Sequence, residues 1–128
     1  MSEVLDLAID QRARDSLAVL AYIYLQFDRA EDAAALLDAL ARIDQDPTWA
    51  RSTRCLALVM AGRSAEAQRE AEALLLVDLD DTRRCHLLRT LARACWNLGL
   101  VEEARAHQEA VRQLLAVTVI RDRGKARS

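Results

Sequence analysis

A helix break followed five residues later by alanine occurs three times in the chain and constrains its fold more than any other feature. The three pairs are Asp28 with Ala33, Gly62 with Ala67, and Gly99 with Ala104. These alanines lie 34 and then 37 residues apart. Apolar residues recur at helical spacing on both sides of each break, so each break predicts the turn of a helical hairpin. The chain is therefore predicted to fold as three helical hairpins in tandem.

The spacing of glycine break and alanine matches the template of the tetratricopeptide repeat, which has a period of about 34 residues. The match predicts an all-α fold in which three degenerate repeats, at about 15–47, 48–80 and 81–117, stack into a right-handed solenoid after an N-terminal helical extension. One domain is expected over residues 1–120. Residues 121–128 carry four basic side chains and no apolar pattern, so a disordered tail is expected, with a specific contact to an acidic partner as the alternative.

The composition is typical of a helical protein and argues against nucleic acid as a partner and against a membrane span. Alanine and leucine supply 45 of the 128 residues, while glycine and proline together supply only four. A net charge of −2 provides no global basic field for nucleic acid, and no apolar run is long enough to span a membrane. Three cysteines without a C-x-x-C pair, and no visible signal peptide, indicate the cytoplasm.

The expected helix boundaries follow from caps and breakers. Residues 2–27 form either one helix or two, the second capped by Asp15 or Ser16. A helix over 30–43 ends before Pro47, Thr48 caps a helix over 49–61, and another runs from 64 to about 77. Asp81 or Thr82 is expected to cap a helix that ends at residue 98, and the last helix is expected from 101 to about 117.

Nothing in the sequence points to catalysis, a cofactor or a metal. His86 and His107 are the only histidines, and no nucleophile motif or phosphate-binding glycine loop is present. Cys85, His86 and Cys95 lack the paired spacing typical of a zinc site. Cys55 and Cys95 fall at core positions of the repeat and are expected to be small buried residues.

The repeat template instead predicts a binding face on the first helix of each hairpin. Its exposed positions correspond here to Asp15, Ala18, Tyr22, Leu25 and Gln26, then Trp49, Ser52, Leu56, Val59 and Met60, then His86, Arg89, Arg93, Trp96 and Asn97. Aromatic, methionine and arginine side chains are typical of a protein-binding surface. The alternative interpretation is that Trp49 and Trp96 fill the ends of the core.

Three small repeats with the runs AAALLDALARID and AEAQREAEALL resemble the tetratricopeptide chaperones of bacterial type III secretion, most closely the SctY (YscY-like) group. Asp28 stands where these repeats usually have glycine. The resemblance implies that the chain binds a small exported protein, an SctX-like client, keeps it soluble in the cytosol and delivers it to the export gate. Related groups of these chaperones bind the needle subunit or the translocators.

Two further hypotheses remain open. The same face could serve an adaptor that binds a folded partner instead of an unfolded client. Self-association without a client is compatible with either function, because the last hairpin carries apolar residues that nothing follows to cover: Val101, Leu114, Leu115, Val117 and Ile120.

Overall fold

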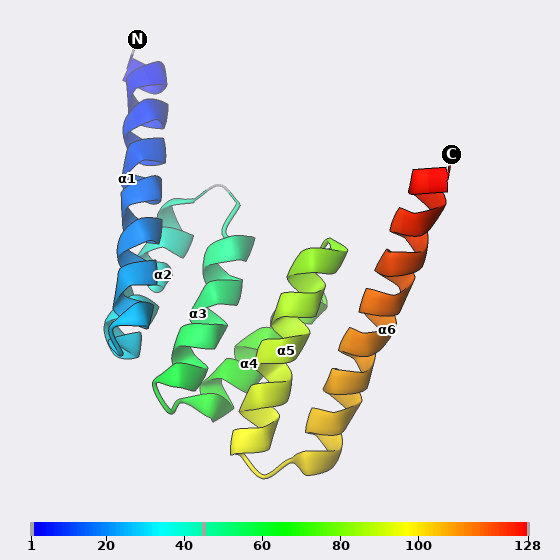
Figure 1. The fold of residues 1–128 in the computed structure, drawn as a ribbon. Coiled ribbons are helices and arrows are strands. Elements are labelled where there is room, and N and C mark those ends of the chain that lie inside the picture. Colours follow the sequence, from blue (N-terminus) through cyan, green and yellow to red (C-terminus); the bar gives the residue numbers. More distant parts are fainter. Residues whose placement is uncertain (1, 45, 128) are drawn as a thin grey trace. The chain divides into compact units, whose positions relative to one another are not determined.

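The computed structural model describes residues 2–44 and 46–127, and in this part of the chain it contains six α-helices and no strand. The helices are α1 (Ser2–Gln26), α2 (Ala30–Ile43), α3 (Thr48–Met60), α4 (Ser64–Leu75), α5 (Asp81–Asn97) and α6 (Val101–Arg127) (Figure 1). The all-α prediction is therefore confirmed. The chain divides into two compact units, Met1–Arg63 with α1 to α3 and Ser64–Ser128 with α4 to α6. The boundary lies inside the second expected repeat, and the prediction of a single domain over 1–120 stays a prediction.

The three predicted breaks have the same local structure. Asp28, Gly62 and Gly99 all take positive φ angles, of 59°, 81° and 78°. The residue after each break donates its backbone N–H to the carbonyl of the residue five positions before it. The distance is 2.8 Å in all three turns: Arg29 to Tyr24, Arg63 to Leu58, and Leu100 to Cys95. This is the Schellman arrangement, which ends a helix by satisfying carbonyls that no helical N–H reaches. In every case the next helix begins two residues after the break.

The alanine that follows each break is completely buried. Ala33, Ala67 and Ala104 all have zero exposed surface. Each lies near the start of the second helix of its hairpin, where a larger side chain would have to displace close-packed neighbours. The repeated pattern in the sequence thus corresponds to a repeated local structure.

Substitutions at glycine should separate backbone strain from packing. Gly99→Ala is expected to reduce the free energy of unfolding by about 1 kcal/mol, because the added methyl group meets open space but alanine disfavours positive φ. Gly124→Ala, inside α6, should instead stabilise by roughly 0.5–1 kcal/mol because alanine favours helix. Asp28→Gly should also stabilise, because Asp28 holds a positive φ that glycine adopts without strain. Urea unfolding followed by circular dichroism measures all three, and equal signs for the two alanine variants would contradict this explanation.

In the first unit α1 and α3 both pack against α2. The sequence left open whether residues 2–27 form one helix or two. The structure has one continuous helix, so neither Asp15 nor Ser16 caps a second one. A salt bridge of 3.1 Å joins Arg14 of α1 to Asp44, the residue that ends α2. The residues of α1 before Arg14 therefore extend beyond the end of α2 (Figure 1). Thr48 is the first residue of α3 rather than its cap.

In the second unit α4 and α6 both pack against α5. The cap of α5 is Asp80, one residue before the expected candidates, and its carboxylate accepts the N–H of Arg83 at 2.8 Å. The expected disordered tail is wrong as far as Arg127, because α6 continues to that residue. An ion pair of 2.7 Å between Arg121 and Asp81 joins this part of α6 to the start of α5. Ser128 lies outside the described residues.

Candidate functional site

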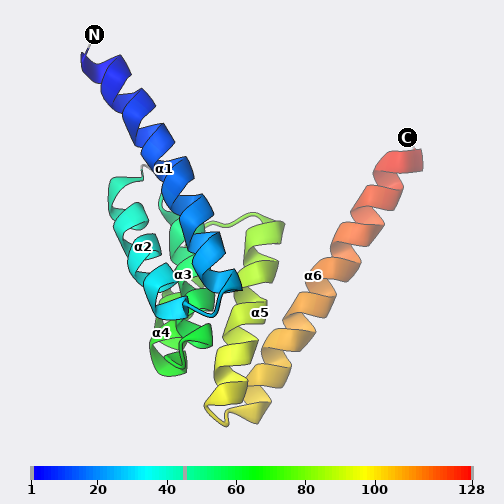
Figure 2. The same cartoon turned by 60° about the vertical axis from the view of Figure 1, so that its left-hand side comes forward.

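A groove between α5 and α6 of the second unit consists of two cavities, of about 570 and 340 Å³, that share Arg89 in their linings. In Figure 2 the two helices meet at their common turn and separate toward the C-terminus. The larger cavity is lined by Arg89, Ala92, Arg93, Trp96, Gln108 and Val111. The smaller one is lined by Asp81, Thr82, Cys85, His86, Arg89, Leu114, Leu115 and Thr118.

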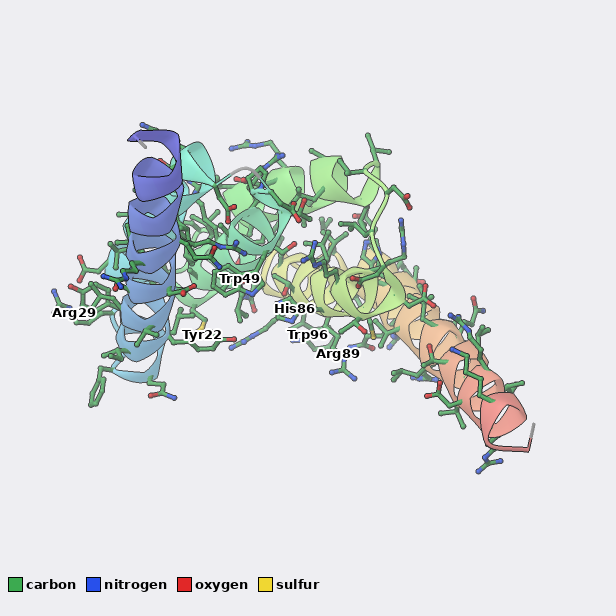
Figure 3. The ribbon with its side chains drawn as sticks, turned by 90° about the horizontal axis from the view of Figure 1, so that it is seen from above. Tyr22, Arg29, Trp49, His86, Arg89 and Trp96 are labelled. Atoms are coloured by element: carbon green, nitrogen blue, oxygen red, sulfur yellow. The ribbon has the colours of Figure 1, made fainter. Side chains whose placement is uncertain are left out.

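Four predicted site residues lie together along one wall of this groove. His86, Arg89, Arg93 and Trp96 follow one another at intervals of three and four residues, which places them on one face of α5. Figure 3 shows His86, Arg89 and Trp96 on the same side of that helix. The Trp96 side chain is 59% exposed. The alternative that Trp96 fills the end of the core is therefore wrong.

Arg89 and Arg93 give the groove its positive charge. Within the described part of the chain, neither Arg89 nor Arg93 forms an ion pair with a carboxylate, whereas Arg14, Arg29, Arg42, Arg63, Arg83, Arg112 and Arg121 all do. The one acidic residue in the lining, Asp81, is already paired with Arg121. A partner that supplies carboxylates would thus meet two available guanidinium groups beside an exposed indole.

The electrostatics of the groove also act on His86. Burial lowers the pKa of His86 below its ordinary value of 6.5, and the nearby Arg89 guanidinium lowers it further. The folded chain therefore binds a proton at this site less readily than the unfolded chain does. As the pH falls below the ordinary pKa of His86, protonation therefore favours the unfolded chain. The folded chain is thus more stable above that pKa than below it.

Removing the charge of Arg89 should raise the pKa of His86. Arg89→Gln is expected to move it toward the ordinary value without reaching it, because burial is the larger cause and remains. The measurement is an NMR titration of the imidazole ring, with the resonance assigned through His86→Gln. Arg105→Gln, at an exposed position of α6 outside the groove lining, is the matched control and should leave the titration unchanged. An unchanged His86 pKa in Arg89→Gln would contradict the electrostatic cause.

The predicted face of the first unit centres on an aromatic pair. The rings of Tyr22 on α1 and Trp49 on α3 lie 6.4 Å apart at 33° (Figure 3). Tyr22 is 55% exposed, and Trp49 is half-buried against it. Met60 and Gln26 are exposed, while Leu25 and Leu56 are half-buried. Tyr22 is thus the most accessible large apolar side chain predicted for this unit.

Part of the predicted face is wrong. Ser52 and Val59 are buried, because α3 buries seven of its residues and so leaves fewer positions for a surface than the repeat template assigns. Asn97 is exposed, but its amide donates to Ser64 Oγ at 3.2 Å, a contact that ties the end of α5 to the start of α4.

The template also missed the wall formed by α6, with Gln108, Val111 and Leu114. The apolar spacing of α6 was the available signal, since Val111, Leu114 and Leu115 recur at three and four residues.

All three cysteines are free thiols. Cys55 and Cys95 are both buried, as expected. Burial raises the pKa of the Cys95 thiol, and the Glu103 and Glu72 carboxylates raise it further. No group of three potential ligands that could hold a metal ion occurs among the residues described. In the same part of the chain, no helix combines the length and hydrophobicity that crossing a bilayer requires.

Comparisons with known proteins add no assignment. No family model matches the chain, and a search of curated proteins also finds no match.

Proposed function

We propose that the chain is a small tetratricopeptide chaperone of type III secretion, which binds an SctX-like exported protein in the cytosol and delivers it to the export gate. In this proposal the three hairpins form consecutive repeats of a right-handed solenoid. The function is binding, without a catalytic step. The main support is the exposed Trp96, set in a groove with Arg89 and Arg93, for which the described residues supply no carboxylate partner.

An exposed indole beside two guanidinium groups favours binding over a purely structural role. Tryptophan and arginine are the residues that most often dominate the energy of protein interfaces. Trp96 lies 59% exposed on a face that also presents Arg89 and Arg93. Tyr22, on the first unit, adds a second exposed aromatic residue that the repeat pattern predicted.

The physical logic of a chaperone suits such surfaces. A protein that awaits export is kept unfolded or partly helical, and its apolar residues would aggregate in water. A groove that accepts an amphipathic segment covers these residues and can release them again. The repeated turns support the tetratricopeptide part of the proposal, because all three have the same φ region, hydrogen bond and buried alanine.

Co-expression with the small open reading frames next to its gene tests the proposal. We expect one of their products to be insoluble when expressed alone and soluble when expressed with this chain, and the two to purify together. Mass spectrometry would identify the client. A copurified product that is folded and soluble by itself would instead favour an adaptor, and a needle subunit or translocator as client would favour a sibling chaperone group.

A further inference from the structure

The first unit shows how the surface of a hairpin is covered by the helix that follows it. After the hairpin of α1 and α2 comes α3, which packs against α2 and reaches α1 through the contact between Trp49 and Tyr22 (Figure 3). Leu37 and Leu40 of α2, which lies against both α1 and α3, have no exposed surface. One helix thus contacts both helices of this hairpin.

The groove between α5 and α6 lies at the corresponding place on the hairpin of the second unit. Counted from the helix break in each hairpin, Arg93 has the position of Tyr22. In the same way Gln108 has the position of Leu37. Leu37 is completely buried, whereas Gln108 is exposed. In the second unit α4 packs against α5 but contributes no residue to either cavity lining, so no described helix of this unit takes the place that α3 takes in the first.

The charge of the groove restricts what can fill it. Arg89 and Arg93 are exposed on one face of α5, and the described residues supply no carboxylate partner for either. Asp81, the acidic residue of the lining, is paired with Arg121. Because the two arginines lie four residues apart, carboxylates at the same spacing on a neighbouring helix can lie opposite both guanidinium groups. A basic segment would be repelled.

Apolar side chains lie next to the arginines. Trp96 of α5 is 59% exposed and Leu115 of α6 is 43% exposed. Val111 and Leu114 extend the apolar wall on α6. Covering these side chains with apolar groups removes them from water, which favours association. A segment that fits the groove therefore needs an apolar face beside its acidic face.

The backbone of such a segment is expected to be helical. An extended chain would gain no backbone hydrogen bonds here, since the N–H and C=O groups of α5 and α6 are paired along their own helices, whereas a helix satisfies its own. The stretch of α5 from His86 to Trp96 spans about 15 Å, so a helix of about three turns reaches both cavities.

We propose that the groove between α5 and α6 binds an acidic amphipathic helix of the exported client, in the place that α3 takes on the first hairpin. The carboxylates of this helix pair with Arg89 and Arg93, and its apolar face covers Trp96 and the apolar wall of α6. The client as its source rests on the proposed function, whereas the acidic and helical character of the segment follows from the groove.

A synthetic peptide tests this chemistry on the full chain without any client. The peptide is an amphipathic helix of about four turns without tryptophan, and its polar face carries two glutamates spaced as Arg89 and Arg93 are. Its binding should cover the Trp96 indole and shift the tryptophan fluorescence of the chain to shorter wavelength. Trp96→Phe should abolish this shift, because Trp49, the other tryptophan, lies in the first unit.

Charge reversal on both sides gives the decisive result. The chain with Arg89→Glu and Arg93→Glu should bind the glutamate peptide at least about tenfold less tightly, since like charges then face each other. A peptide with lysine in place of each glutamate should show the opposite preference between the two chains. Arg69→Glu with Arg105→Glu, at exposed positions outside the groove lining, is the matched control and should bind the glutamate peptide like the wild type. Circular dichroism verifies that every variant is folded.

A third peptide tests the conformation of the bound segment. It carries the same glutamates and a central proline, which interrupts the helix. The wild-type chain should bind it at least about tenfold less tightly than the first peptide. Equal affinity for the two would contradict a helical occupant.

Three further results would overturn the proposal. A glutamate peptide that leaves the fluorescence of the wild-type chain unchanged would exclude an acidic helix as occupant. Equal affinities of the glutamate and lysine peptides would show that the arginines do not select the partner. A dimer of the chain alone that Arg89→Glu with Arg93→Glu dissociates, measured by sedimentation equilibrium, would assign the groove to a second copy.

Co-expression separates this proposal from the chaperone function. A client that copurifies equally well with the chain carrying Arg89→Glu and Arg93→Glu would agree with the chaperone function and overturn the groove as its binding site. The expected peptide binding without any copurified client would support the specificity of the groove and contradict the chaperone function.

Discussion

Leu91→Ala is expected to lower the free energy of unfolding by about 2–5 kcal/mol, the range for truncation of a fully buried leucine. Leu91 lies on α5 and has 0% exposed surface. Its removal takes apolar area away from the core and leaves a cavity that the surrounding helices fill only in part. The measurement is urea unfolding followed by circular dichroism, compared at the midpoint.

Leu76→Ala provides the matched control, since the same atoms are removed from a side chain that is 89% exposed. It should change the free energy of unfolding by no more than about 0.5 kcal/mol. Similar losses in the two variants would show that Leu91 does not belong to the core. A loss of circular dichroism signal in two separate steps would indicate that the two units unfold independently.

Trp96→Ala combined with Tyr22→Ala is expected to weaken client binding by about 2–5 kcal/mol in total. Both side chains are more than half exposed, so their truncation removes contact area from the binding surfaces with little loss of core packing. Helical content should therefore stay unchanged. Isothermal titration calorimetry with the copurified client measures the effect.

Phe27→Ala is the control for this double substitution, because Phe27 is a highly exposed aromatic residue outside both candidate surfaces. It should leave client affinity within about 0.5 kcal/mol of the wild type. Wild-type affinity of the double variant would show that the client binds elsewhere. Each single variant would then show which of the two units contributes more to the affinity.

Local signals in the sequence predicted the helices well. The breaks at Gly62 and Gly99 were predicted correctly because positive φ strongly favours glycine, and the equivalent break at Asp28 followed from the repeat spacing. Cys55 and Cys95 were predicted to be buried from their place in the repeat. The end of α6 was mispredicted because residues 121–125 have no apolar pattern and their helix receives support from the contact between Arg121 and Asp81.

The candidate site was predicted in part. Sequence alone placed His86, Arg89, Arg93 and Trp96 on one face, because helical spacing is a local property. It did not show that α6 forms the opposite wall of a groove, nor that Arg89 and Arg93 lack carboxylate partners among the described residues. Both depend on which side chains approach from other helices, and the repeat template does not predict these contacts.

The sequence by itself therefore determined the all-α class, the three hairpin turns and the face of α5 that carries Trp96, because each follows from the order of neighbouring residues. Only the tertiary structure decided the burial of Ser52 and Val59, the pairing of Tyr22 with Trp49, and the available charge of the groove. These properties arise where helices distant in the sequence meet, and packing and charge pairing there depend on the positions of both partners.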